Sequence, residues 1–187
     1  MLVTLFSLSY TLGSINSAVI ICFILKKPSP TTLGSNNPGA TNVFRFGGKK
    51  AATITLLGDM LKGFVPVVTA HMLGMNINTT VCIGLTAVIG HIFSIFWKFK
   101  GGKGVATLLG VMIGLYWVIG GIFLAIWITS FLITSHSSLA GMLAAMVTSI
   151  FIILYVNLKM ALPFLIMALV ITYRHHRNIK ILLMKGL

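Results

Sequence analysis

The sequence contains few charged residues and almost no acidic ones. Asp, Glu, Lys and Arg make up 8% of its 187 residues, and Asp59 is the only acid. Charged residues account for about a quarter of an ordinary soluble domain, so the composition excludes that class of protein. The 57% share of hydrophobic residues instead indicates an all-α integral membrane protein with short loops. No stretch has the composition of a flexible linker, and we therefore expect residues 1–187 to form a single domain.

Residues that bind metals are scarce as well. Cys22 and Cys82 both lie in apolar runs, where we expect them to pack as small hydrophobic side chains. The chain has one carboxylate, and no thiol lies near the adjacent histidines His175 and His176 in the sequence. We therefore predict neither a metal site nor a cofactor.

Basic residues outnumber the acid by 14 to one and give a net charge of +13. A chain this apolar offers no soluble surface for reading nucleic acid, so we exclude nucleic acid as a partner. Basic loops of a membrane protein mark its cytoplasmic side, and they can also bind an anionic ligand.

Five apolar stretches are long enough to enter a membrane, at 2–25, 51–73, 77–97, 105–134 and 139–173. One span needs roughly 20 residues, so the last two stretches are too long for one straight helix each. Gly120-Gly121 and the pair Asn157 and Lys159 indicate a break in each, which predicts seven helices, some of them short. Five helices, two of them long and tilted, are the alternative. We expect 2–25 to be a retained span rather than a signal peptide.

The placement of Lys and Arg predicts an N-terminus outside and a C-terminus in the cytoplasm. With seven helices, only Lys159 lies outside, and Lys62 lies within the second span. Asp59 and Lys62 stand at i and i+3 on one helix face, which predicts a structural ion pair; a direct role with substrate is the alternative. The basic residues on the cytoplasmic side are then Lys26, Lys27, Arg45, Lys49, Lys50, Lys98, Lys100, Lys103, Arg174, Arg177, Lys180 and Lys185.

Three polar clusters fall on this cytoplasmic side. The first is LGSNNPGATNVFRFGGKK, residues 33–50. Its main-chain N–H groups and the hydroxyls of Ser35 and Thr41 can satisfy phosphate oxygens, and Arg45 can add a bidentate charged contact. A solvated turn with orienting charges explains the same residues equally well.

The second cluster is KFKGGKG, residues 98–104. A nucleotide-binding P-loop needs glycine where Trp97 stands and Ser or Thr where Gly104 stands, so we exclude a nucleotide as ligand. The remaining interpretation is a glycine turn that opens a helix and directs its amides and a lysine at an anion. The residues of this turn are Gly101, Gly102, Lys103 and Gly104.

The third cluster is RHHRNIK, residues 174–180, directly after the last apolar stretch. Its histidines suggest a base, whereas a juxtamembrane anchor for anionic lipid is the alternative. Together the three clusters suit a small phosphorylated ligand that meets a reactant dissolved in the lipid.

With these clusters and the motifs below, the sequence resembles the bacterial acyl-phosphate:glycerol-3-phosphate acyltransferases, the membrane-integral PlsY family. The matching motifs run from Gly13 to Asn178, nearly the whole chain. They are GSNNPGATNVFR (34–45), GDMLKGFVPV (58–67), GHIFSIFWKFKGGKGVAT (90–107), SSLA (137–140) and HHRNI (175–179).

The resemblance implies seven helices in the bacterial cytoplasmic (inner) membrane, with the active site at the cytoplasmic face. It implies transfer of an acyl chain from acyl-phosphate to the 1-hydroxyl of glycerol-3-phosphate, giving lysophosphatidic acid and phosphate for phospholipid synthesis. Acyl-CoA and acyl carrier protein are not direct donors, and other phospholipid-synthesis enzymes are possible partners. The implied catalytic residues are Lys103, His175 and Asn178, and the implied phosphate-binding residues are Ser35, Thr41, Asn42, Arg45, Gly101, Gly102 and Gly104.

The chain departs from the family at Asn16 and Ser94, where proline is usual, and its terminal Gly-x-Glu is missing or shifted. The missing glutamate leaves an inactive homologue as one alternative function. The composition and polar clusters taken alone leave a non-catalytic anion or lipid transporter as the other. Because acyl-phosphate carries a good leaving group, we expect direct attack by the glycerol hydroxyl without a covalent acyl-enzyme. The proton goes either to a substrate phosphate or to His175.

Overall fold

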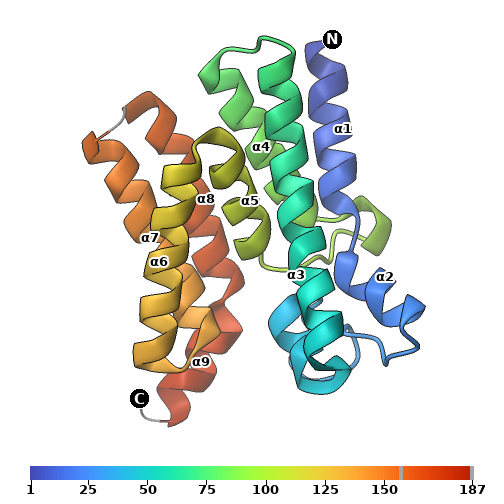
Figure 1. Ribbon diagram of the computed structural model, residues 1–187. Helices are drawn as coiled ribbons and strands as arrows, with labels where there is room; N and C mark the ends of the chain where they lie inside the picture. The colour runs from blue at the N-terminus through green and yellow to red at the C-terminus, as the bar shows by residue number, and fades with distance from the viewer. Residues whose placement is uncertain (156–157, 186–187) are drawn as a thin grey trace.

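The computed structural model describes residues 1–155 and 158–185, and all regular secondary structure in this part of the chain is helical (Figure 1). Its helices pack side by side as a bundle, and the two termini lie at opposite ends of it. The elements are α1 (Leu2–Ser14), α2 (Ser17–Ile24), α3 (Ala40–Met72), α4 (Ile77–Ile92), the 3-10 turn η1 (Ile95–Trp97), α5 (Val105–Leu115), α6 (Trp117–Thr134), α7 (Ser137–Tyr155), α8 (Leu158–Arg174) and α9 (His176–Lys185).

Several of these helices are long and apolar enough to cross a membrane. Within the described residues, α3, α4 with η1, α6 and α7 meet this condition, and the bent pair α1–α2 adds a fifth candidate. Helix α5 and residues 161–174 of α8 are apolar but shorter. The membrane-protein class is thus supported, while the count of seven spans stays a prediction.

The first predicted span, 2–25, is broken into two helices that meet at an angle of 46°. Asn16 produces the break, because its side-chain oxygen accepts a hydrogen bond from the amide of Val19 at 3.2 Å and caps α2. The carbonyl oxygen of Ile15, freed by the break, accepts a hydrogen bond from Nζ of Lys62 at 2.7 Å. A polar cap thus starts α2 at the position where proline is usual in the family.

The predicted break at Gly120-Gly121 is wrong. The chain leaves helical geometry at Tyr116 instead, with φ −149° and ψ 111°, and both glycines lie inside α6. Gly120 is needed for packing, because a Cβ there would collide with Ile113 of α5. The other predicted break, at Asn157, lies outside the described residues, between the end of α7 and the start of α8.

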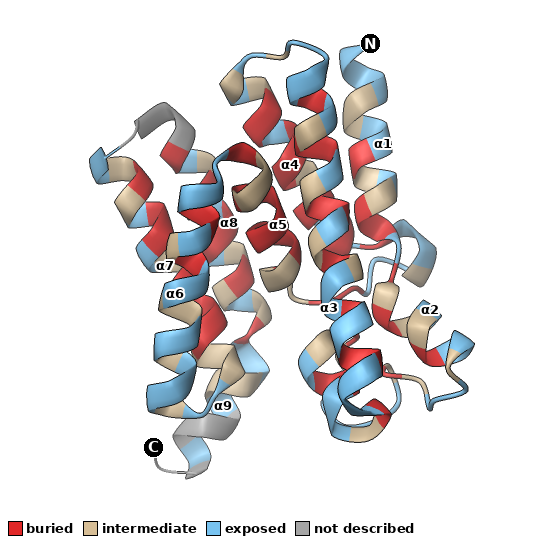
Figure 2. Ribbon diagram, in the orientation of Figure 1, coloured by how far each residue is buried: buried red, intermediate tan, exposed pale blue. Residues whose placement is uncertain are grey.

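Small residues bring the central helices close together, as is common in membranes. A Cβ at Gly63 would strike the backbone of Thr107, and a Cβ at Gly110 would strike the backbone of Met60, so α3 and α5 pack with nearly touching backbones. The main core gathers apolar side chains from α3 to α8, and Figure 2 shows buried positions concentrated along α4 and α5. A smaller apolar cluster around Val43 and Cys22 joins α2 to the start of α3 and supports the loop between them.

Candidate active site

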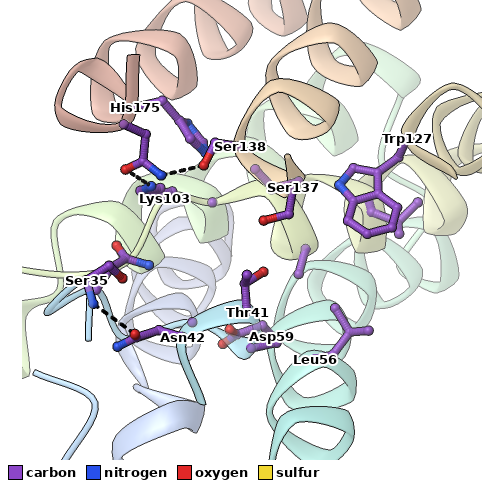
Figure 3. Close-up of a pocket in the computed structure, with 18 of the residues that line it drawn as sticks. Ser35, Thr41, Asn42, Leu56, Asp59, Lys103, Trp127, Ser137, Ser138 and His175 are labelled. Atoms are coloured by element: carbon purple, nitrogen blue, oxygen red, sulfur yellow. Dashed lines mark hydrogen bonds between the residues drawn. The ribbon is translucent and has the colours of Figure 1, made fainter. Parts of the chain in front are cut away.

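The three polar clusters meet around one cavity of about 200 Å³. Its wall is formed by the loop before α3, by α3 itself, by His91 of α4, by the start of α5, by α6, by the start of α7, and by the corner between α8 and α9 (Figure 3). The predicted site residues on this wall are Ser35, Thr41, Asn42, Arg45, Asp59, Lys103, Gly104, His175 and Asn178.

Asn42 organises the first loop. Its side-chain oxygen accepts a hydrogen bond from the amide of Ser35 at 2.9 Å, and its NH₂ group donates to the carbonyls of Pro30 and Leu33 at 3.0 and 2.9 Å. Asn42 therefore lines the cavity, but its carboxamide holds the loop that presents Ser35. Thr41 lies in the first turn of α3 and Arg45 in the next, and both also border the cavity.

The structure does not place Gly101 and Gly102 on the cavity wall. The amide of Gly101 donates to the carbonyl of Ile92 at 3.0 Å, and that of Gly102 donates to the carbonyl of His91 at 3.1 Å. A Cβ at Gly101 would collide with the His91 carbonyl, so this close approach requires glycine. These two residues shape the turn by docking on α4, and their amides do not point at a ligand.

Arg174 holds the same turn from the opposite side. One terminal nitrogen of its guanidinium donates to the carbonyls of Gly101 and Gly102 at 3.1 and 3.4 Å, and the guanidinium lies 5.9 Å from the centre of the Phe93 ring. The sequence indicated Arg174 only as a basic residue of the third polar cluster and gave it no role of its own. The motif carried no signal for it, since the partners are 72 and 73 residues away in sequence.

Gly104 and Lys103 face the cavity. Gly104 has a φ of +87° and precedes α5 as its N-cap, so the first-turn amides of this helix have no partner within the helix. Nζ of Lys103 donates to the side-chain oxygen of Asn178 at 2.7 Å, and the NH₂ group of Asn178 donates to the hydroxyl of Ser138. Asn178 thus orients the Lys103 ammonium, and Ser138 in turn orients Asn178. The SSLA motif contained Ser138, but its residue type alone does not indicate this role.

The pKa of Lys103 is lowered to about 8, first by burial and then by the positive charges of Arg174 and Arg45. Lys103 and Arg45 line the cavity, and together with the nearby Arg174 they repel one another, so an anionic ligand would relieve that repulsion. The electrostatics therefore favour an anionic ligand.

His175 is buried beside Lys103 and is neutral at physiological pH. Burial first, and then the charge of Lys103, lower its pKa to about 4. Its Nδ1 lies 2.8 Å from the carbonyl of Ile171, which can only accept a hydrogen bond, so Nδ1 carries the proton. Nε2 is therefore the free acceptor of the ring.

Asp59 and Lys62 form an ion pair, with Nζ of Lys62 3.0 Å from Oδ1 of Asp59. Both side chains are buried, and Asp59 borders the cavity beside Thr41 (Figure 3). Lys62 neutralises a carboxylate that would otherwise repel an anion in the cavity.

The opposite end of the cavity is apolar, which the sequence did not reveal. Figure 3 shows Trp127 and Leu56 at the end away from Lys103 and His175. Leu109, Phe123 and Leu124 complete this wall. These residues lie within apolar helices, where the sequence does not distinguish a ligand-facing side chain from a core or lipid-facing one. The cavity is thus cationic at one end and apolar at the other.

In residues 1–155 and 158–185, no group of three or more His, Cys, Asp and Glu side chains lies close enough together to hold a metal ion.

Comparison with known proteins shows the family of this chain. The sequence model of the glycerol-3-phosphate acyltransferase family matches residues 3–185. The chain belongs to this family. It is 51% identical over 172 residues to the glycerol-3-phosphate acyltransferase of Francisella tularensis subsp. novicida, covering 92% of this chain and 84% of the relative. It is 50% identical over the same length to the enzyme of Francisella philomiragia.

Two solved structures of PlsY, described as an integral membrane glycerol 3-phosphate acyltransferase, share the fold. The glycerol 3-phosphate form superimposes with a TM-score of 0.92 at 33% sequence identity, covering 98% of this chain and 92% of that chain. The lysophosphatidic acid form gives a TM-score of 0.90 with the same identity and coverage. The predicted membership in the PlsY family is confirmed, and with it the classification as a membrane acyltransferase.

Proposed function

We propose that this PlsY-family protein transfers an acyl chain from an acyl-phosphate to the 1-hydroxyl of glycerol-3-phosphate. The products are lysophosphatidic acid and inorganic phosphate. The observation that carries the proposal is a single cavity lined both by the cations Lys103 and Arg45 and by the apolar side chains of Trp127 and Phe123, with Lys103 and Trp127 at opposite ends (Figure 3). Such a cavity suits a phosphate group joined to an acyl chain, and the structural relatives are described with glycerol 3-phosphate and with lysophosphatidic acid.

The reaction needs no covalent acyl-enzyme. The 1-hydroxyl oxygen attacks the carbonyl carbon of the acyl-phosphate and forms the new ester bond. The bond between that carbon and the phosphate oxygen breaks, and its electron pair leaves with the phosphate. The hydroxyl of Ser138 accepts a hydrogen bond from Asn178, which is not the arrangement of a serine activated by a base.

Catalysis then rests mainly on positioning and on charge neutralisation. Two phosphate groups repel each other as they approach, and Lys103 and Arg45 offset that repulsion. The amides at the start of α5 contribute further donors. Asn178 keeps the Lys103 ammonium directed at the cavity, because the two side chains are hydrogen-bonded.

The proton of the attacking hydroxyl passes to a substrate phosphate oxygen in this mechanism. A base with a pKa of about 4, as His175 has here, is too weak to remove a hydroxyl proton efficiently near pH 7. Nε2 of His175 instead accepts a hydrogen bond from glycerol-3-phosphate and orients it. A dianionic phosphate beside Lys103 would raise the pKa of His175, which keeps the histidine as the alternative base.

For the membrane, we propose seven spans with the N-terminus outside and the cavity open to the cytoplasm of a bacterial inner membrane. The opposite positions of the two termini in the bundle (Figure 1) support an odd number of crossings. The excess of Lys and Arg in the loops around the cavity supports a cytoplasmic location for it.

The direct test uses the purified protein in liposomes with palmitoyl-phosphate and radiolabelled glycerol-3-phosphate. We expect labelled lysophosphatidic acid and inorganic phosphate in equal amounts. Parallel reactions contain palmitoyl-CoA as donor, or the Lys103→Met variant as enzyme, and we expect no product in either. Absence of product with the wild-type protein would refute the enzyme proposal, and product formed from palmitoyl-CoA alone would refute the proposed donor.

A further inference from the structure

His91 is a buried histidine that the mechanism above does not use. It lies in the last turn of α4 and is only 7% exposed. Its backbone carbonyl accepts the amide hydrogen of Gly102 at 3.1 Å. Its ring packs on the same residue, because a Cβ at Gly102 would collide with Nε2 of His91. Both the backbone and the side chain of His91 therefore contact the residue before Lys103.

The ring is held in this position from its other side. Nδ1 lies 3.2 Å from the hydroxyl of Thr107 in α5 and 3.6 Å from Oδ1 of Asp59 in α3. Asp59 is itself paired with Lys62, which donates to the carbonyl of Ile15 at the break between α1 and α2. The only acid of the chain thus links the histidine ring to α3 and, through Lys62, to the junction between α1 and α2.

The turn needs such support, because glycine has no side chain with which to anchor itself. The guanidinium of Arg174 donates hydrogen bonds to the carbonyls of Gly101 and Gly102, whereas the ring of His91 packs against Gly102. Between these two contacts the turn has little freedom to move. Lys103 follows directly, and its ammonium must lie within hydrogen-bond distance of a substrate phosphate.

We propose that His91 is a positioning residue for acyl transfer: its imidazole, oriented by Thr107 and Asp59, keeps Gly102 in place and so directs Lys103 at the phosphate of glycerol-3-phosphate. This inference rests on the proposed role of Lys103. His91 borders the cavity, but its ring contacts Gly102, and the proposal assigns to it an indirect action through the glycine turn.

Two substitutions of His91 distinguish the contact of its ring with Gly102 from its contacts with Thr107 and Asp59. His91→Gln retains a polar atom near the position of Nε2, against Gly102. His91→Asn retains one near the position of Nδ1, toward Thr107 and Asp59, but leaves empty the space beside Gly102. A purely structural role in the buried network predicts that Asn is the better replacement, whereas positioning of the turn predicts that Gln is.

The measured quantities are the Kd of radiolabelled glycerol-3-phosphate, the KM and kcat of acyl transfer, and the melting temperature. Since a displacement of about 1 Å can cost up to 10²-fold, we expect His91→Asn to raise Kd and KM about tenfold. We expect His91→Gln to stay within about threefold of wild type, because the turn remains supported. His71→Asn, an exposed histidine in the last turn of α3, is the matched control and should change none of these values.

Equal losses in His91→Asn and His91→Gln, or binding weakened less by Asn than by Gln, would overturn the proposal. Thr107→Val provides the test if the His91 variants do not fold, because it removes only the hydroxyl that orients the ring. Because the ring still fills the space beside Gly102, Kd should rise by no more than about threefold, as for His91→Gln, and a rise of about tenfold would count against the proposal. The binding measurement is independent of turnover. A wild-type protein that binds glycerol-3-phosphate but forms no product would refute the proposed reaction and leave this inference testable.

Discussion

Replacing Lys103 with methionine is the most informative single change to this protein. Methionine keeps most of the apolar stem of lysine and removes its charge. A hydrogen bond to a charged group contributes about 1.5–3 kcal/mol, which corresponds to about 10- to 150-fold in glycerol-3-phosphate binding. Because lost stabilisation of transition-state charge adds to this, often about 10²–10³-fold in kcat, we expect kcat/KM to fall at least 10²-fold.

The same variant should fold normally. In the wild-type protein the Lys103 ammonium is desolvated and lies near two other cations, Arg174 and Arg45, which lower its pKa to about 8. Removing that charge relieves repulsion, although it leaves the side-chain oxygen of Asn178 without its donor. We therefore expect the melting temperature of Lys103→Met to match or exceed that of wild type, measured by scanning fluorimetry in the same detergent.

The pH dependence gives a second measure of Lys103. Phosphate binding needs the protonated amine, so kcat/KM for glycerol-3-phosphate should fall as the pH rises through about 8. Stability should change in the opposite direction. The unfolded chain holds this proton up to the ordinary value of 10.5, so between pH 8 and 10.5 it binds more protons than the folded chain, and stability rises with pH. Lys103→Met should lose both effects.

If Lys103→Met retains kcat/KM within about threefold of wild type, less than the loss of one charged hydrogen bond, then Lys103 does not bind substrate phosphate. The proposed site would then be wrong, whatever the protein's activity.

Three further changes test other parts of the site. His175→Gln should weaken glycerol-3-phosphate binding but keep kcat within about threefold, because a catalytic base would be worth about 10²–10⁴-fold; a kcat loss in that range would assign the base to His175. Gly101→Ala should lower the free energy of unfolding by about 1–3 kcal/mol and abolish activity, because its new Cβ meets a backbone carbonyl of α4. A Cβ at Gly121 would have no atom within 4 Å, so the control variant Gly121→Ala should melt at or above the wild-type temperature. Asp59→Asn should destabilise the protein by about 3–5 kcal/mol because it leaves a buried ammonium unpaired. The double variant with Lys62→Met should recover most of that loss, and thermal unfolding without recovery would show that the two charges do not act as a pair.

The convergence of the three polar clusters was predictable from the sequence. Each cluster follows or precedes an apolar stretch and carries Lys or Arg, so the positive-inside rule assigns all three to one face of the membrane. The structure then brings Arg45, Lys103 and His175 to the wall of one cavity. Charge and hydropathy report which side of a membrane a loop occupies, and in a small bundle the loops on one side have little room to separate.

The sequence did not predict which residues of each cluster line the cavity for a ligand and which instead hold the protein backbone. Asn42, Gly101 and Arg174 could each have bound phosphate, and each instead holds backbone of the protein. An amide, a backbone N–H group and a guanidinium offer the same donors to a phosphate oxygen and to a carbonyl oxygen. Which oxygen each donor meets depends on contacts between residues distant in sequence. The residue type alone does not reveal those contacts.

The position of the break before α6 shows a similar limit. Gly120 and Gly121 suggested a turn because glycine is a poor helix former in isolation. Inside a tightly packed bundle, however, Gly120 lets α6 approach Ile113 of α5, and the helix gains more from that contact than it loses in propensity. Tyr116, an ordinary residue for a strand or a helix, carries the break instead.

The early break has a consequence for the chemistry of the site. Helix α5 has only 11 residues, a length of about 16 Å at 1.5 Å per residue, which is about half of a hydrocarbon core. Its first turn therefore begins level with the middle of α6 rather than at the end of the bundle (Figure 1). This depth removes Lys103 from bulk water, which accounts for its lowered pKa, and sets it within one cavity with the apolar side chains of Phe123 and Trp127. The short helix thus brings the cationic turn and the apolar side chains into one cavity, which is the arrangement that the proposed reaction requires.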